Sequence, residues 1–521
     1  MIPRAAESTP ERLTTGRVYL DYDKLVQRIA AWVDTKNPRV RGCEDLQVRA
    51  RLVQCIVALT SDGYARQAAQ QVDKSGCPLP PTSQFVVVNG LKICRKSGAV
   101  SISVGQWLKH FSLFAAAWLH MLAFLFAAIF RRSPKETMPA TLLMEAGAGS
   151  MECDDRFVRF CRNGLIGPLS SAKFMIIRSP QPPLRATDSS FVYARHPLVE
   201  FATRCLRRPQ WVLLFASHLR APLTFLHAIF ACPASVLRAR DIAFVPMVRC
   251  LDRKSLIEAV VITTSSFGSQ PLWMKGLVEQ HFKLHMVWYS QNFIPKIYLG
   301  EREQSSLPPA RHMRVDVHWV WTDGFKFYLE SLGQKSEIKV VGPILWYLQE
   351  KKSGLIKSCV QVALFDVLPL PDEQQPFGAI KNYYSVSTIS RFVADGVELC
   401  REMEHESGWD ISVRLKHKRI PRIGRHDSQY LEFLETLSDK NPRFQLMDDQ
   451  TDLFEFLEQS HFSVSVPYTS TAYVAAFLDR PAIYYDPFNE LIPAYENNDR
   501  VHFASSKIEL RRLMRACLNL K

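Results

Sequence analysis

Three consecutive hydroxyl side chains stand between a predicted strand and a predicted helix near the end of the chain. Residues 462–466 alternate apolar residues with serine, which predicts a strand, and Pro467 ends it because proline cannot donate to a sheet ladder. The hydroxyl residues that follow are Thr469, Ser470 and Thr471. A short helix is expected over Ala472–Leu478 and a strand over Ala482–Tyr485. Hydroxyl groups at a helix start can cap its free N–H groups, and the positive helix end favours an anion. The segment is therefore either a phosphate-binding turn or an ordinary capped βαβ unit.

A basic cluster follows another predicted strand of the same region, Asp410–Leu415. It consists of Lys416, His417 and Lys418. Two ammonium groups and an imidazole can offset the negative charge that develops on a leaving phosphate. The alternative is a solvated basic loop.

Polar residues also follow several predicted strands in the middle of the chain. The strands cover Thr141–Met144, Ala259–Thr264, Leu284–Trp288 and Val315–Trp321. The polar residues near their ends are Glu145, Ser265, Ser266, Tyr289, Asn292 and Asp323. Ligands of open α/β sheets gather at the carboxyl ends of strands, so these residues predict a second binding surface.

Length and composition limit the classes of protein that fit. A chain of 521 residues is too long for one core, so two or three domains are expected. The net charge of +14 suits nucleic acid, an anionic membrane or a phosphorylated ligand. Nucleic acid is not expected as a partner, because no nucleic-acid-binding motif is present. The 12 cysteines form no C-x-x-C pair, which indicates reduced thiols in a cytosolic compartment and no cysteine-bound metal.

The chain divides into four predicted parts. Residues 1–104 form an accessory domain, with a hairpin at 85–94 that turns at Asn89-Gly90. Residues 105–135 hold a membrane-associated helix. Residues 136–350 and 351–521 are two α/β, Rossmann-like domains, separated by the charged break Glu350–Gly354.

The helix of residues 105–135 is the most apolar part of the chain. Phe111–Phe130 contains no acidic or basic side chain other than His120, and it is long enough to span a bilayer. An in-plane anchor and a buried core helix are the alternatives. A single crossing would place residues 1–108 opposite the rest of the chain. A second apolar stretch, Trp211–Leu237, is interrupted by His and Pro residues and is either a membrane-surface helix or a pair of core helices.

Three segments resemble GT-B glycosyltransferases, most closely those of bacterial capsule and O-antigen biosynthesis. They are Met286–Asn292, Val340–Tyr347, and the turn Tyr468–Thr471 together with Pro481–Pro487. The resemblance covers residues 140 to 521. It implies two Rossmann-like domains that face a cleft, with a nucleotide sugar held by the C-terminal domain and the acceptor by the N-terminal domain.

The resemblance also implies roles for individual residues. Thr469, Ser470 and Thr471 would contact the donor phosphates. Lys416, His417 and Lys418 lie where CMP-sugar transferases have a His-Pro motif, but Lys418 replaces the proline, so CMP and UDP donors both stay open. The two α/β domains contain no Asp-x-Asp motif, which predicts a metal-independent reaction with no cofactor beyond the nucleotide sugar.

An inverting enzyme of this kind needs a base for the acceptor hydroxyl, whereas a retaining enzyme does not. Glu145 is the predicted base, because it follows the first strand of its domain and precedes glycines. The other candidates are Asp154, Asp155, His285 and Asp323.

The expected acceptor is a lipid-linked saccharide or a growing surface polysaccharide at the cytoplasmic face of the inner membrane. The alternatives are a glycerol-phosphate polymer transferase on the same fold and a non-catalytic membrane scaffold.

Overall fold

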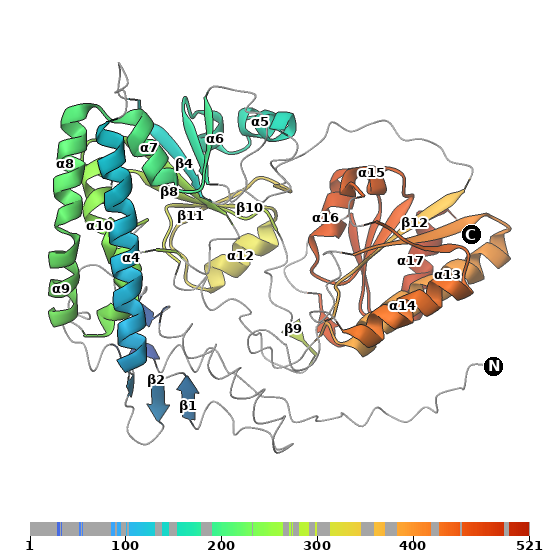
Figure 1. Cartoon of the computed structure of the whole chain (residues 1–521). Coiled ribbons are helices and arrows are strands. Elements are labelled where there is room, and N and C mark those ends of the chain that lie inside the picture. Colours follow the sequence, from blue (N-terminus) through green and yellow to red (C-terminus); the bar gives the residue numbers. More distant parts are fainter. Residues whose placement is uncertain are drawn as a thin grey trace.

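Two parallel sheets organise the protein (Figure 1). The computed structural model describes residues 29–31, 33, 52, 53, 55, 85–88, 91–94, 100, 101, 104–130, 138–144, 154–178, 190–231, 233–263, 270, 271, 273, 274, 281–290, 297–299, 313–344, 359–369, 383–417, 427–448, 451–493 and 500–519.

The first sheet has seven strands in the order β11-β10-β8-β7-β4-β5-β6, and every pairing in it is parallel. Its strands are β4 (Ala140–Met144), β5 (Met175–Arg178), β6 (Phe191–Ala194), β7 (Ile257–Thr263), β8 (Lys283–Val287), β10 (Val317–Val320) and β11 (Glu337–Val340). The central strands read as apolar runs because both faces of the sheet are covered, as is usual for parallel sheets.

The second sheet has six parallel strands in the order β14-β13-β12-β15-β16-β18. Its strands are β12 (Val360–Asp366), β13 (Ile411–His417), β14 (Phe444–Leu446), β15 (Phe462–Ser465), β16 (Ala482–Tyr485) and β18 (Val501–Ala504). Counted along the chain, the second sheet follows the 3-2-1-4-5-6 order of Rossmann domains, and the first follows the same order with a seventh strand, β11, at its edge. The predicted fold class, two Rossmann-like α/β domains, is confirmed.

Helices cover both sheets. Those of the first domain are α5 (Asp154–Arg162), α6 (Gly167–Ser170), α7 (Pro197–Cys205), α10 (Ala239–Asp252) and α12 (Asp323–Ser331). Those of the second are α13 (Val386–Ser407), α14 (Ser428–Lys440), α15 (Leu453–Glu458), α16 (Ser470–Phe477) and α17 (Lys507–Cys517).

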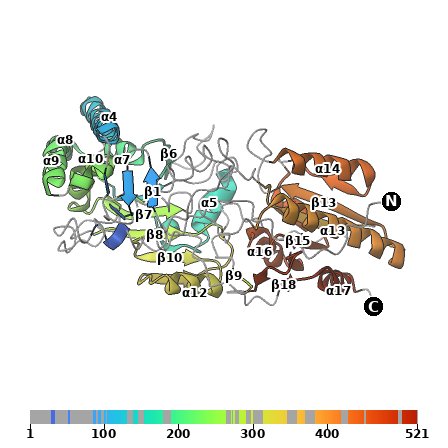
Figure 2. The ribbon, with the colours of Figure 1, turned by 90° about the horizontal axis from the view of Figure 1, so that it is seen from below.

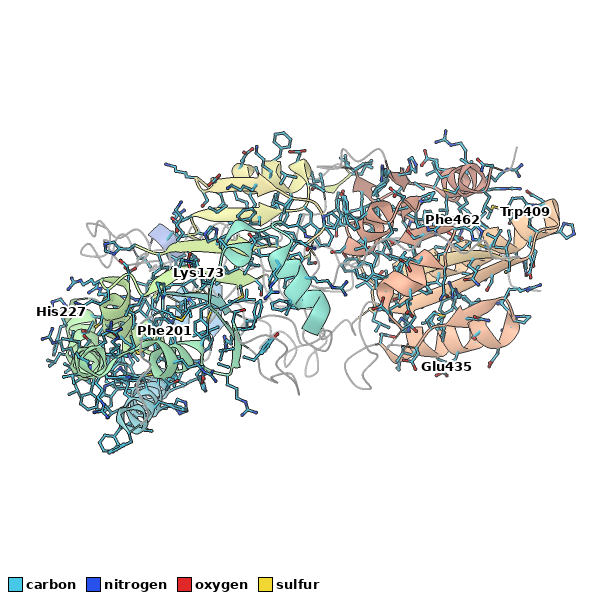
Figure 3. The ribbon with its side chains drawn as sticks, turned by 90° about the horizontal axis from the view of Figure 1, so that it is seen from above. Lys173, Phe201, His227, Trp409, Glu435 and Phe462 are labelled. Carbon is cyan, nitrogen blue, oxygen red and sulfur yellow. The ribbon has the colours of Figure 1, made fainter. Side chains whose placement is uncertain are left out.

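An additional helical layer lies outside the first domain. It consists of α4 (Val104–Ile129), α8 (Arg208–Leu219) and α9 (Ala221–Ala231), followed by a 3-10 helix over Pro233–Arg238. In two perpendicular views α4 lies beside α8, α9 and α10 (Figures 1 and 2). The layer, marked by His227, is at the opposite end of the molecule from Trp409 of the second domain (Figure 3). Within the described residues, Val104–Ala127 and Arg208–Phe230 are each long and apolar enough to cross a membrane.

The predicted hairpin of the accessory region is confirmed in the backbone. β1 (Phe85–Val88) pairs antiparallel with β2 (Leu91–Cys94), and β3 (Val100–Ser101) pairs with β2. Because Val88 is opposite Leu91, two residues separate the strands. β6, β18, α5 and α10 are elements that the sequence analysis did not identify.

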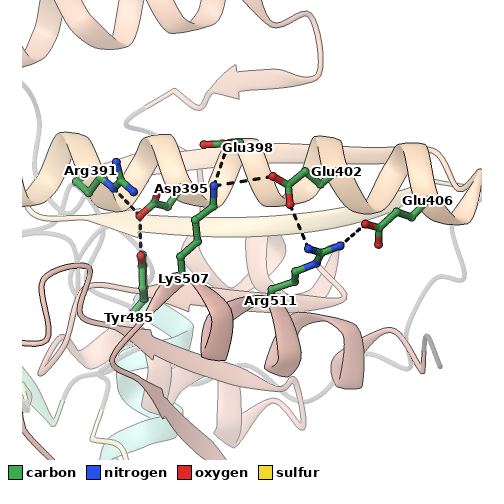
Figure 4. A network of polar contacts seen from close by, with 8 residues as sticks. All are labelled: Arg391, Asp395, Glu398, Glu402, Glu406, Tyr485, Lys507 and Arg511. Carbon is green, nitrogen blue, oxygen red and sulfur yellow. Dashed lines mark hydrogen bonds and ion pairs between the residues drawn. The ribbon is translucent and has the colours of Figure 1, made fainter. Parts of the chain in front are cut away.

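A row of ion pairs attaches the last helix to α13 (Figure 4). The carboxylates of Glu398, Glu402 and Glu406 recur every four residues and so lie on one face of α13. Lys507 Nζ is 2.9 Å from Glu398, and Arg511 pairs with Glu402 and Glu406. Each exposed pair contributes little to stability, so the row mainly fixes the position of α17.

Two tryptophan–histidine pairs cross between neighbouring strands of the first sheet. Trp288 Nε1 donates to His318 Nδ1 at 3.1 Å, and Trp319 Nε1 donates to His285 Nδ1 at 3.2 Å. Burial lowers the pKa of both histidines to about 4. His285 is therefore a neutral hydrogen-bond acceptor inside the sheet, which argues against its role as a base.

These histidines predict that stability falls with acidification. Their pKa values in the folded protein lie below the ordinary 6.5, so the unfolded chain binds more protons between pH 6.5 and 4. Stability is complete above that window and is lost as the pH falls through it, by about 2 kcal/mol per histidine at about pH 5. Urea unfolding, followed by tryptophan fluorescence at several pH values, measures this dependence.

A pair of variants separates this effect from general acid sensitivity. His318→Asn keeps an acceptor for Trp288 but cannot be protonated, and we expect the contribution of His318, about 2 kcal/mol at about pH 5, to disappear from the pH dependence. His227→Asn changes an exposed histidine of α9 and should leave the dependence unchanged. If the free energy of unfolding of His318→Asn depends on pH as steeply as that of the parent protein, the interpretation is contradicted.

Candidate functional site

The candidate site lies at the carboxyl ends of three adjacent strands of the second sheet. β12 pairs with β13 on one side and with β15 on the other. In a Rossmann domain this is the point where the strand order reverses, and ligands bind outside the strand ends there. Asp366 is opposite His417 in the register, and Phe365 is opposite Ser465. The ends of all three strands therefore meet at one edge.

A buried carboxyl group joins two of these elements to a helix. Nδ1 of His417 is 2.9 Å from Oδ2 of Asp366 and 3.1 Å from Oδ1. The Tyr430 hydroxyl, from α14, donates to the same Oδ2 at 2.6 Å. The side chains of Asp366 and His417 are 0% and 7% exposed. Burial, with the nearby Asp366, raises the pKa of Tyr430 well above its usual range, so the phenol stays a donor.

This arrangement determines which nitrogen of His417 can meet a ligand. A carboxylate that accepts from Nδ1–H holds the imidazole in one tautomer and one orientation. Nε2 is then the ring nitrogen left for a ligand. His417 was identified from the sequence, whereas Asp366 and Tyr430 were not identified as site residues. Only the parallel register of β12 and β13 brings Asp366 to His417.

The Lys416 side chain does not lie beside that of His417, and its predicted role in donor binding stays a prediction. Successive strand residues point to opposite faces of a sheet. The Lys416 ammonium reaches the Asp448 carbonyl oxygen, at 3.5 Å, beyond the end of β14. Lys418 lies outside the described residues.

The hydroxyl turn leads from β15 into α16. Thr469 stands at the N-cap position of α16, but its hydroxyl donates back to the Val466 carbonyl at 2.7 Å and makes no cap bond. The expectation that this side chain caps the helix is therefore wrong, because the hydroxyl closes the turn instead. The hydroxyl of Thr471 is 2.9 Å from that of Ser465 and 3.2 Å from that of Thr469. Thr469 is buried, while Ser470 and Thr471 are half-buried and can meet a ligand.

A left-handed residue shapes this turn. Tyr468 has φ of +63°, which costs a non-glycine residue about 1–3 kcal/mol. Surrounding hydrogen bonds hold the conformation: the Tyr468 hydroxyl donates to the Ile492 carbonyl at 2.7 Å, and the Tyr484 hydroxyl donates to the Thr469 carbonyl. Such strain persists where neighbouring contacts impose it, and it is typical of functional turns.

The start of α16 also meets the first domain. Ser470 Oγ is 3.2 Å from Oγ of Ser290, which follows β8. Nearby in the chain, β9 (Ile297–Tyr298) of the first domain pairs antiparallel with β17 (Leu491–Ile492) of the second. The carboxyl edges of the two sheets therefore face each other at this junction.

The acceptor-side residues are only partly described. Tyr289 is half-buried directly after β8. Asp323 is exposed in the first turn of α12, where a negative charge stabilises the helix end. Asp154 and Asp155 begin α5. Glu145, Ser265, Ser266 and Asn292 lie outside the described residues. The strands that precede Glu145 and Ser265, β4 and β7, are neighbours at the reversal point of the first sheet. The roles of all these residues stay predictions.

The Asp366–Tyr430 contact predicts a measurable loss of stability in Tyr430→Phe. The substitution removes one donor from a buried carboxyl group, and a hydrogen bond to a charged group contributes about 1.5–3 kcal/mol. Urea unfolding should show a loss of unfolding free energy in this range. The slope of that free energy against urea concentration should stay unchanged. Equal stability of the variant and the parent protein contradicts the contact.

The Ser290–Ser470 contact predicts efficient cross-linking between the domains. The oxygen separation of 3.2 Å is close enough for two cysteines at these positions to approach disulfide geometry. We expect Ser290→Cys/Ser470→Cys to form an intramolecular disulfide under mild oxidation, detected as a reversible shift on non-reducing gels. Each single variant is the control, and a double variant that behaves like them shows that the two edges do not meet.

Comparisons with known proteins match the part of the chain that contains the candidate site. The sequence profile described as polysaccharide biosynthesis PFTS motif protein matches residues 224–514, more than half of the chain. Within these residues Pro467-Tyr-Thr-Ser470 differs from the letters P-F-T-S only by tyrosine in place of phenylalanine. This segment is the hydroxyl turn described above. No curated protein matches the chain.

Three solved structures illustrate the distant similarity in shape. The lipopolysaccharide outer core galactosyltransferase WaaB has 10% identity and a TM-score of 0.40, over 73% of this chain and 90% of that chain. The wall teichoic acid polymerase TagF has 11% identity and a TM-score of 0.37, over 81% and 90%. TarM has 10% identity and a TM-score of 0.33, over 54% of this chain, which spans only 52% of TarM.

The profile match covers the second half of the first domain, including β7, β8, β10 and β11, and most of the second domain with the hydroxyl turn. It agrees with the predicted resemblance to polysaccharide biosynthesis proteins. The chain belongs to the polysaccharide biosynthesis PFTS motif protein family.

Proposed function

We propose that this protein is a membrane-associated glycosyltransferase. It moves a sugar from a nucleotide sugar to a lipid-linked saccharide or a growing surface polysaccharide. The observation that carries the proposal is the junction at Ser470, where the hydroxyl turn at the reversal point of the second sheet meets the carboxyl edge of the first. A donor held by one sheet and an acceptor held by the other would meet there. Membership of a polysaccharide biosynthesis family supports the choice of sugar transfer.

The start of α16 is the proposed site for the donor phosphates. The first N–H groups of a helix have no partner within the helix, and the helix dipole favours negative charge at this end. Thr469 supplies no cap bond, so it does not occupy those groups. Ser470 and Thr471 add half-buried hydroxyls. Together they suit the oxygens of a nucleoside monophosphate or diphosphate.

His417 is the proposed group that stabilises the leaving phosphate. Asp366 accepts from its Nδ1–H, and in the doubly protonated imidazolium form Nε2–H would donate to an oxygen on which charge develops. A preorganised imidazole can supply this stabilisation without a metal ion, and metal independence remains part of the proposal. CMP-linked and UDP-linked donors are both compatible with these residues.

The acceptor side is proposed on the first sheet. Glu145 is the proposed base of an inverting reaction, since it directly follows β4 at the reversal point. Ser265, Ser266, Tyr289, Asn292 and Asp323 follow neighbouring strands and would orient the acceptor. The proposed location is the cytoplasmic face of the inner membrane, and the two long apolar helices support membrane association.

Nucleotide binding tests the donor site. A ligand at about a hundred times its dissociation constant stabilises the folded protein by about 2.7 kcal/mol, which thermal unfolding detects. We expect one of CMP, CDP, UDP or UMP to raise the melting temperature of the parent protein. Ser470→Ala, Thr471→Ala and His417→Ala should each weaken binding by about 5- to 100-fold, the loss of one or two hydrogen bonds to charge.

Matched controls and a transfer assay complete the test. Ser438→Ala changes a serine of α14 away from the reversal point and should bind nucleotide normally. Labelled sugar from the nucleotide sugar identified should enter a lipid-extractable or polymeric product. Nucleotide release without sugar incorporation favours a glycerol-phosphate transferase. Absence of both nucleotide binding and turnover overturns the proposed activity. The non-catalytic membrane scaffold is then the remaining alternative.

A further inference from the structure

The outer helical layer exposes large apolar side chains on α4, α8 and α9. Leu108, Leu119 and Phe126 of α4 are exposed, as are Val212, Leu223 and Phe230 of the α8–α9 pair. The helices lie side by side in both views (Figures 1 and 2). Exposed apolar area of this extent on neighbouring elements indicates a binding surface.

The opposite side of α4 is already packed against the first domain. Phe114, Met121 and Leu125 are buried, and their spacing of seven and four residues places them on one helix face. α4 contacts α7, α8 and α10 along its length. Trp118 Nε1 donates to the His218 carbonyl at 3.2 Å, and His218 Nε2 is 2.9 Å from the Trp118 carbonyl. One face of α4 is thus unavailable to lipid.

The path of the chain excludes a crossing by the α8–α9 pair. β4 precedes the pair and β7 follows it, yet the two strands are hydrogen-bonded neighbours, with Leu143 opposite Val261. The chain between them therefore crosses any bilayer an even number of times, and α10, which follows α9, would have to be the return crossing. α10 has 14 residues, including Arg240, Asp241, Arg249 and Asp252, and is too short and too charged to span a bilayer. The α8–α9 pair therefore has both of its ends on one side of any membrane.

The same argument applies to α4. Ile29 and Leu52 precede α4 and are fully buried in one apolar cluster with Val236 and Ile242. The latter two follow α9. Because the residues before α4 and the residues after α9 share one cluster, α4 also has both ends on one side. Of the alternatives left open by the sequence, a single crossing is thus inconsistent with the structure.

Positive charge borders the apolar layer. The rings of His120, on α4, and His196, before α7, are 4.9 Å apart. Arg195 directly precedes His196, Arg178 pairs with Ala194 in the register of β5 and β6, and Arg240 lies in the first turn of α10. The sequences of α4, α8 and α9 contain no acidic residue. Phosphate-bearing headgroups complement such a border.

We propose that α4, α8 and α9 form an in-plane docking surface for an anionic phospholipid bilayer. Their exposed apolar side chains enter the boundary between headgroups and acyl chains, and Arg178, Arg195 and Arg240 lie near the lipid phosphates. None of the three helices crosses the bilayer. This inference deepens the membrane association proposed above, and it does not depend on catalytic activity.

Vesicle flotation tests the surface. We expect the full-length protein to float with phosphatidylglycerol–phosphatidylcholine vesicles, with at least about tenfold weaker association with phosphatidylcholine alone or at high salt. Leu223→Glu/Phe230→Glu should abolish flotation. Ile508→Glu is the matched control, because Ile508 and Phe230 are both 82% exposed but Ile508 lies on α17 of the second domain. Equal flotation of all three proteins overturns the proposal.

Size-exclusion chromatography tests whether a second copy of the chain, rather than a bilayer, covers this surface. A dimer of the parent protein that Leu223→Glu/Phe230→Glu dissociates, without flotation of either protein, overturns the lipid assignment. Nucleotide binding of the same variants in solution is measured in parallel. Because flotation needs no nucleotide, failure of docking and failure of the transferase proposal are distinguishable.

Terminal tags test the in-plane orientation. With an epitope at each end of the chain, protease should remove both tags in inverted inner-membrane vesicles and neither in intact spheroplasts. Removal of the tags from opposite faces would show that α4 crosses the membrane and would overturn the in-plane orientation.

Discussion

The buried carboxyl group of Asp366 is the constraint on which the second domain depends. A buried polar group without partners destabilises a protein by several kcal/mol, so Asp366 requires donors. It finds them on β13 and α14, through His417 and Tyr430. The contact is possible only if β12 and β13 pair in the observed register. One carboxyl group thus connects the packing of α14, the alignment of the central strands and the orientation of the imidazole.

The fold was more accessible from sequence than the site. The buried central strands of both sheets are apolar runs, and the proline after Val466 is a strong end signal for β15. β6 and β18 were missed because each has only four residues. Asp366 and Tyr430 were not identified because their meeting depends on strand register and helix packing, and residues 64 positions apart give no local pattern.

The hydroxyl turn shows how local propensity and tertiary contacts compete. Propensity places threonine at a helix start to cap it, yet Thr469 closes a hydrogen bond to Val466 instead. That bond accompanies a strained Tyr468, held by the hydroxyls of two tyrosines. The result is a rigid turn at the reversal point of the sheet, with two adjacent hydroxyl groups left half-buried. Tyr468, which replaces phenylalanine in the family's four letters, supplies the hydroxyl that bonds to the Ile492 carbonyl.

The small sheet of β9 and β17 has a mechanical consequence. Within the described residues, the ladder pairs Leu491 with Tyr298 and Ile492 with Ile297, and the Leu299 N–H also donates to the Glu490 carbonyl. The Tyr468 hydroxyl bonds to Ile492, so this ladder is attached directly to the hydroxyl turn. A rotation that separates the two large sheets must either pivot on the ladder or break it. With the ladder as pivot, the turn stays near the axis and moves least, while the far edges of the sheets travel furthest.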